Sequence, residues 1–150
     1  MNITDGESMD EFTEKIVENS EICREQFNRR FKNEIDYSEK SLIYIDEILE
    51  ETHQNLPQLK EDEKQWIINI IGSYIFETAR RNFGGKYYWY ERGNQPILVT
   101  GQPTFEISIL AFEKTKGRIE NGKEDSIPFF FEGYSSRVKN AKKGESVLFV

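Results

Sequence analysis

The residue pair best suited to chemistry lies near the middle of the chain. Glu77 and Arg81 are four residues apart, and the aromatic segment KYYWYE follows at residues 86–91. On a helix this spacing lets a carboxylate pair with a guanidinium. If Tyr88 and Trp89 lie beside the pair, the four residues could instead bind a small ligand or serve a weak hydrolase. A glycosidase also needs a second acid at a defined distance, which the sequence does not place. A structural ion pair and a ligand site both remain open.

Several other chemistries find no support in the sequence. A single cysteine and a single histidine exclude an internal disulfide and the usual zinc ligand sets. His53 has no nucleophile motif beside it, and we expect it to be exposed at a helix end. Gly84 and Gly85 follow a helix instead of preceding one, so they favour a helix cap over a phosphate site. We predict no catalytic residue, no metal and no cofactor.

The formal net charge of -7 is unevenly distributed along the 150 residues. Residues 1–65 hold 18 acids and 8 bases, whereas residues 66–150 hold 9 acids and 12 bases. An acidic front half suits a basic protein partner and makes nucleic acid an unfavourable one, because phosphate contacts need positive charge. The simpler alternative, that these charges only keep surface helices soluble, stays open.

The densest acidic face is predicted on a helix that begins at Ser38 or Ser41 and continues to Thr52. Its buried face is formed by Leu42, Ile45, Ile48 and Leu49. The predicted partner-binding residues occupy the other side of this helix: Asp46, Glu47, Glu50 and Glu51.

Two longer helices are predicted around this one. The first covers residues 10–31, with an apolar stripe formed by Phe12, Ile16, Cys23, Phe27 and Phe31. A cysteine inside such a stripe is expected to be a core thiol. The second covers residues 61–83 and is apolar around most of its circumference, which is typical of a central helix. Gly72 would let a neighbouring element approach this helix closely.

After Gly85 the pattern changes to aromatic and β-branched segments at residues 86–91, 96–100 and 104–109, which predict a three-stranded antiparallel meander. The alternation of Phe105, Ile107 and Ile109 with polar residues places one face of this sheet on the helices and the other in water. Two shorter helices follow, over residues 111–120 and from Asp125 or Ser126 onward. The predicted fold is α+β, with three N-terminal helices packed on the meander.

The chain is expected to form one domain over residues 1–150, with residues 1–9 flexible and residues 144–150 either a tail or an edge strand. No apolar run reaches the length of a membrane helix, and residues 1–12 lack the character of a signal peptide. We therefore expect a cytoplasmic protein without a membrane partner.

The segments GSYIFE at residues 72–77 and NFGGKYYW at residues 82–89 resemble a group of small bacterial domains. In these domains a G-x-Y-x-x-E helix leads through Gly-Gly to an aromatic strand. The resemblance covers residues 38–140 and implies a helix-plus-sheet fold in a bacterial cytoplasm, but no activity. Small acidic proteins of this build are also similar to immunity proteins encoded beside secreted toxins.

The leading hypothesis is a non-enzymatic acidic protein that binds a basic partner, most concretely a toxin. The alternatives are the ligand site or weak hydrolase around Glu77 and Arg81, and a structural subunit of a larger assembly.

Overall fold

The buried helix α3 (Glu61–Phe83) organises the fold, and its bounds are those predicted. Every residue from 71 to 79 is buried. The computed structural model describes residues 3–4 and 8–150, and side chains from residue 11 onward. Gly72 permits the predicted close approach, because a Cβ atom built on it would lie 2.2 Å from Cδ1 of Phe112. That ring belongs to α4 (Ala111–Asn121), which packs against α3.

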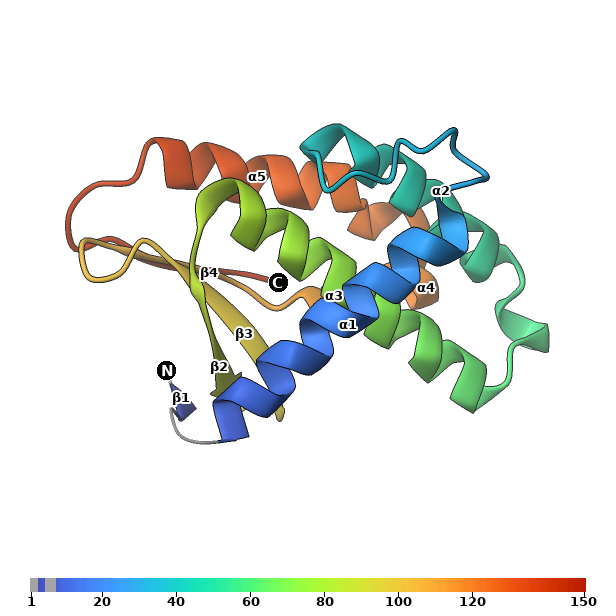
Figure 1. Ribbon diagram of the computed structural model, residues 1–150, viewed down its shortest axis with the longest axis horizontal. Helices are drawn as coiled ribbons and strands as arrows, with labels where there is room; N and C mark the ends of the chain where they lie inside the picture. Colours follow the sequence, from blue (N-terminus) through green and yellow to red (C-terminus); the bar gives the residue numbers. More distant parts are fainter. Residues whose placement is uncertain (1–2, 5–7) are drawn as a thin grey trace.

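Helix α1 (Ser8–Phe27) crosses α3 and makes its most extensive helix contact with it (Figure 1). Ile16 and Cys23 of the predicted stripe are buried, and the three phenylalanines pack against the same core. The helix ends at Phe27, four residues before the predicted end. Phe31 therefore reaches the core from a turn, where Lys32 and Asn33 take positive φ angles that end helical pairing.

Serine hydroxyls cap the turn that leads into α2 and the start of α5. Ser38 accepts a hydrogen bond from the backbone N–H of Ser41 in the short turn η1 (Glu39–Ser41), which leads directly into α2 (Leu42–Gln54). Ser126 caps α5 (Ile127–Lys139) in the same way, with Pro128 in the first turn. The turns η2 (Leu56–Gln58) and η3 (Gly122–Asp125) precede α3 and α5. The four apolar residues predicted for the inner face of α2 are all buried.

The sheet is mixed and has five strands in the order β1-β2-β3-β4-β5. The predicted meander corresponds to its three central strands, β2 (Lys86–Tyr90), β3 (Gln95–Thr100) and β4 (Glu106–Ile109). At the two edges, β1 (Ile3–Thr4) pairs antiparallel with β2, and β5 (Ser146–Phe149) pairs parallel with β4. The α+β class is thus confirmed, but three strands were too few, because the outer two come from opposite ends of the chain.

The sheet face away from the helices is less polar than the alternation in β4 suggested. Ile97 and Val99 are buried there with Leu110, and Tyr88, Tyr90 and Leu148 pack against them. Ser108, expected to meet water, is fully buried between two neighbouring strands. Both faces of the sheet therefore carry apolar clusters, and the larger one lies on the helices.

Short strands occupy both ends of the described chain. Of the segment predicted to be flexible, residues 1–2 and 5–7 lie outside the described residues, whereas Ile3–Thr4 form β1 and α1 begins at Ser8. Of the two alternatives for residues 144–150, the structure has the edge strand, β5. None of the helices in the described part of the chain combines the length and apolar character needed to cross a bilayer.

Candidate functional site

The Glu77 carboxylate lies at the centre of an ion-pair network between α3 and β2. Its side chain is fully buried, and Arg80 binds it through Nε at 2.6 Å and Nη2 at 2.8 Å. Arg81 Nε lies 3.2 Å from Oε1, so the predicted pair is formed. The hydroxyl of Tyr87 donates the fourth hydrogen bond, at 2.8 Å. Four donors occupy the acceptor positions of the carboxylate.

These contacts also set the protonation of Glu77. Burial by itself raises the pKa of Glu77, but hydrogen bonds from Arg80 and Tyr87 outweigh burial and hold that pKa below its ordinary value. A general acid needs a raised pKa and a proton to give. The geometry therefore favours the structural ion pair over a catalytic carboxyl group.

The four residues of the alternative ligand site are not brought together. Glu77 and Arg81 meet, but Tyr88 points to the opposite face of the sheet, where its hydroxyl donates to Gln102 at 2.9 Å. Trp89 packs edge-on against Phe12 of α1, with ring centroids 5.9 Å apart. Successive side chains of a strand alternate between faces, so Tyr87 supplies the ring beside Glu77.

Two of the four predicted partner-binding acids point to a buried arginine of α4. Asp46 accepts hydrogen bonds from Arg118 Nε at 2.9 Å and Nη2 at 3.2 Å, and from the backbone N–H of Ile127 at 3.0 Å. Glu50 Oε1 lies 2.9 Å from Arg118 Nη2. The Arg118 side chain is fully buried, so these two acids join α2 to α4 and to the start of α5.

The other two acids of α2 lie at the surface. Glu51 forms an exposed ion pair with Arg30, and the hydrogen bonds from that guanidinium lower the pKa of Glu51. Glu47 is exposed. Three of the four predicted acids are thus neutralised within the chain, and α2 presents less negative charge than its sequence indicates.

The unneutralised acidity lies instead on the outer side of α1. Glu11, Glu14, Glu18 and Glu25 are exposed and form no ion pair or side-chain hydrogen bond with a described residue. They recur with Ile22, itself 41% exposed, at helical spacing, and together these five residues are the α1 acidic stripe. The same spacing argument that located the apolar stripe could have located this one.

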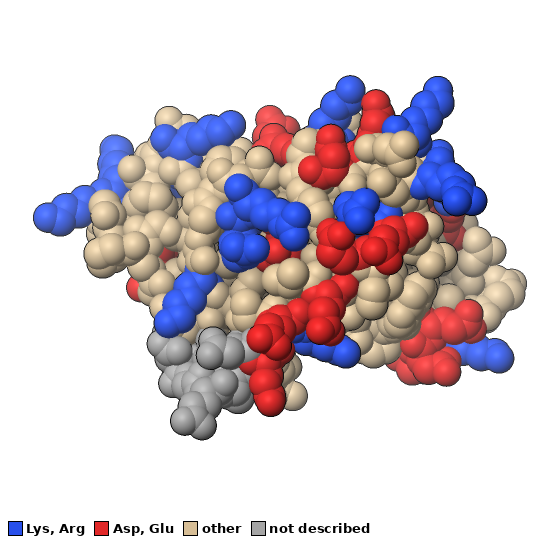
Figure 2. Space-filling view, viewed as in Figure 1, with Lys and Arg blue, Asp and Glu red and all other residues tan. Residues whose placement is uncertain are grey.

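A second acidic group lies at the start of α3. Glu61, Asp62 and Glu63 are exposed there, and Trp66, which is 46% exposed, lines a shallow hollow with two of them. Figure 2 shows acidic side chains along α1 and at this end of α3 on one face of the molecule. Exposed tryptophan and unpaired carboxylates are therefore available together on that face.

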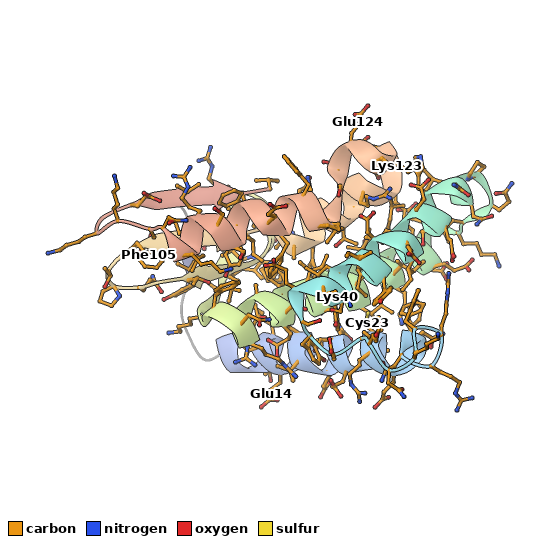
Figure 3. The ribbon with its side chains drawn as sticks, turned by 90° about the horizontal axis from the view of Figure 1, so that it is seen from above. Glu14, Cys23, Lys40, Phe105, Lys123 and Glu124 are labelled. Atoms are coloured by element: carbon orange, nitrogen blue, oxygen red, sulfur yellow. The ribbon has the colours of Figure 1, made fainter. Side chains whose placement is uncertain are left out.

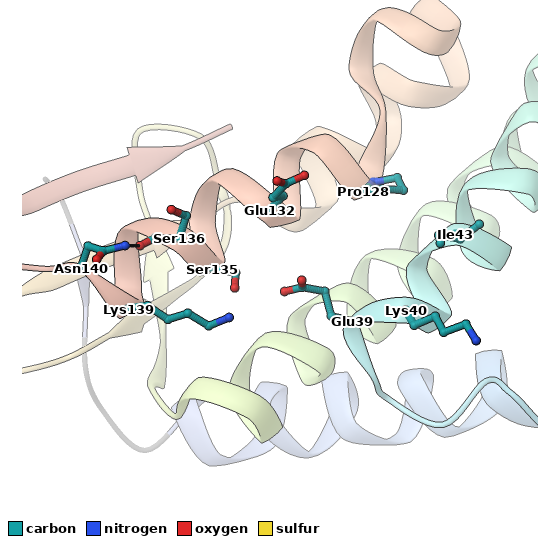
Figure 4. A pocket seen from close by; sticks show the side chains of 9 residues that line it. All are labelled: Glu39, Lys40, Ile43, Pro128, Glu132, Ser135, Ser136, Lys139 and Asn140. Atoms are coloured by element: carbon teal, nitrogen blue, oxygen red, sulfur yellow. Dashed lines mark hydrogen bonds between the residues drawn. The ribbon is translucent and has the colours of Figure 1, made fainter.

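A separate groove lies between η1 and α5, and sequence analysis did not identify it. Its lining combines polar side chains of both charges, among them Glu39, Ser135 and Lys139, with apolar ones (Figure 4). These residues are about 100 positions apart in sequence, so only the folded arrangement brings them together.

The lone cysteine and the lone histidine both serve the fold. Cys23 points inward from α1, in contrast to Glu14 (Figure 3), and burial raises the pKa of its thiol. His53 is half-buried, contrary to the expected exposed position. Its Nδ1 lies 2.7 Å from the carbonyl oxygen of Ile119, and η3 places Gly122 against the other side of the ring. Among the described residues, no group of three or more acidic, His or Cys side chains is arranged to hold a metal.

Comparison with known proteins does not assign this arrangement. A scan against protein-family models finds no match, and searches of curated proteins and of solved structures find no significant match. The resemblance drawn from residues 38–140 stays a prediction, and the function must be argued from the geometry.

Proposed function

We propose that the protein is a non-enzymatic acidic binding protein whose partner is a basic protein. Its most concrete form is an immunity-type protein that neutralises a basic bacterial toxin. The observation that supports this most is the α1 acidic stripe, four exposed carboxylates without a partner in the described chain. Unpaired surface charge of one sign attracts a partner of the opposite sign and speeds its association.

The start of α3 supplies what the stripe lacks, an aromatic anchor. Trp66 is half-exposed and flanked by Glu61 and Asp62. Tryptophan is enriched among the residues that dominate interface energies, and its ring face attracts Lys and Arg side chains. The proposal therefore assigns steering to the α1 acidic stripe and anchoring to Trp66.

The alternative function around Glu77 has weaker support. The Glu77 carboxylate already accepts four hydrogen bonds from neighbouring side chains. Tyr88 and Trp89, the two aromatic residues expected beside it, lie elsewhere. We therefore do not extend the proposal to a hydrolase.

The test measures association of the purified protein with the product of the gene next to its own, which the proposal requires to be a basic protein. Glu14→Lys should slow association by roughly three- to tenfold at low salt and have less effect at high salt, because surface attraction is screened. Trp66→Ala should mainly speed dissociation, since loss of an anchor weakens the formed complex.

Glu124→Lys is the matched control, with the same change of charge on the opposite side of the molecule from Glu14 (Figure 3). It should leave both rates unchanged. If the two proteins form no complex, or if Glu124→Lys slows association as much as Glu14→Lys does, the proposed function is wrong.

A further inference from the structure

A groove with a volume of about 570 Å³ separates α5 from η1 and the first turn of α2. One of its walls is a single face of α5, because Pro128, Glu132, Ser135 and Lys139 recur at spacings of four, three and four residues. This volume is within the range typical of small-molecule sites. The two walls of the groove are far apart in the sequence. Ser38 caps η1 in one wall, and Ser126 caps α5 in the other.

A serine hydroxyl opens into this groove. Ser135 is only 3% exposed, yet its side chain forms no hydrogen bond with any described residue. Its Oγ is not one of the enclosed side-chain atoms that lack a partner, so it meets the open space of the groove and can bond a molecule there. Figure 4 shows it pointing into the space between Glu39 and Lys139.

Opposite charges flank this hydroxyl. The Glu39 carboxylate extends from η1 and the Lys139 ammonium from α5, and they point toward one another across the space (Figure 4). No ion pair joins them, nor do they pair with another described residue. Lys139 lies one helical turn beyond Ser135, and its Nζ is 5.8 Å from the centre of the Phe83 ring, a cation–π contact that favours this position.

The opposite end of the groove is apolar. Ile43, which is 50% exposed, and Pro128 line that end (Figure 4). A ligand that fits both ends needs two opposite charges close together and an apolar group beyond them.

We propose that this groove binds a free α-amino acid with an apolar side chain. The ammonium of the ligand pairs with Glu39, and its carboxylate pairs with Lys139 and accepts a hydrogen bond from Ser135. The apolar side chain of the ligand covers Ile43 and Pro128. This site is independent of the α1 acidic stripe, so it extends the protein beyond the proposed partner binding.

The first experiment is calorimetric titration of the full chain with L-leucine and two analogues of similar shape. Leucinamide lacks the carboxylate, and 4-methylpentanoate lacks the ammonium. We expect L-leucine to bind and each analogue to bind about two- to fivefold more weakly, because each analogue loses one ion pair with an exposed side chain. If L-leucine releases no heat of binding at millimolar concentrations, or if either analogue binds as tightly, the proposal is wrong.

The second experiment uses variants of the groove. Glu39→Gln and Lys139→Met should each weaken leucine binding about two- to fivefold, because both side chains are exposed to water, and Ser135→Ala should weaken it by a similar factor. Lys40→Met is the matched control, since Lys40 lines the same groove but points away from the space (Figure 4). Unfolding temperatures confirm that each variant is folded. Equal losses from Lys40→Met and Lys139→Met would overturn the assignment.

Discussion

Arg118 and Glu77 are the two charged side chains that are fully buried among those described, and they are opposite in sign. Arg118 is a cation held by the acids Asp46 and Glu50, whereas Glu77 is an anion held by Arg80 and Arg81. The first network joins helices 72 residues apart in the chain, and the second lies mostly within two turns of α3. The same ion-pair chemistry therefore stabilises a contact between distant helices in the first network and the last turns of a single helix in the second.

The largest effect is expected from breaking the long-range network. Arg118→Met keeps much of the side-chain volume but leaves Asp46 and Glu50 without their cation. Removing one partner of a buried ion pair costs about 3–5 kcal/mol, and the partial exposure of both acids places this variant near the lower value. Denaturant unfolding measures the loss.

Lys64→Met is the control for this variant. It breaks the Lys64–Glu120 pair, which also joins α4 to another helix but has one partner 37% exposed. A loss below about 1 kcal/mol is expected for such a pair. If both variants lose the same stability, burial is not what distinguishes the Arg118 network.

A smaller loss, about 2–3 kcal/mol, is expected from Glu77→Gln, again by denaturant unfolding. The amide keeps the shape but removes the charge on which both arginines converge. Arg80 and Arg81 are each 37% exposed and can turn toward water, which limits the cost. Tyr87→Phe, which removes only the fourth hydrogen bond, should cost about 1 kcal/mol. A Glu77→Gln variant as stable as the parent would contradict the structural role.

The pH dependence of stability tests the Glu77 network in a second way. The pKa of Glu77 is lower in the folded protein than its ordinary value of 4.5, so its contribution is complete above that pH and is lost as the pH falls through the folded-state pKa. The stability gap between the parent protein and Glu77→Gln should therefore narrow as the pH falls below about 4.5. Unfolding curves between pH 7 and pH 3 measure this gap, and a gap that widens toward low pH would contradict the assignment.

Local patterns allowed much of this fold to be predicted. The apolar stripe of α1, the bounds of α3 and the close approach at Gly72 follow from residues near one another in sequence, because helical periodicity and glycine size act locally. The Glu77–Arg81 pair was predictable for the same reason. The caps at Ser38 and Ser126 likewise depend on the next three residues.

What the sequence did not reveal depends on distant partners. Nothing near Asp46 indicates that Arg118 neutralises it, so the four acids of α2 were assigned to a partner surface. The strands β1 and β5 are too short for a clear alternation and pair only after the chain has returned to the sheet. The groove between Glu39 and Lys139 has the same origin, since no local pattern brings η1 to α5.

The smallest effect concerns a pair with the geometry of the Arg118 network but none of its burial. Arg30 donates two hydrogen bonds to Glu51, as Arg118 does to Asp46, but both partners are about half-exposed. Water competes for these groups, and ordering two long side chains offsets much of the attraction. A double-mutant cycle with Arg30→Ala and Glu51→Ala should give a coupling energy of about 0.2–1 kcal/mol, reduced further by salt. A coupling as large as the loss from Arg118→Met would mean that two-armed geometry, and not burial, determines the strength of these pairs.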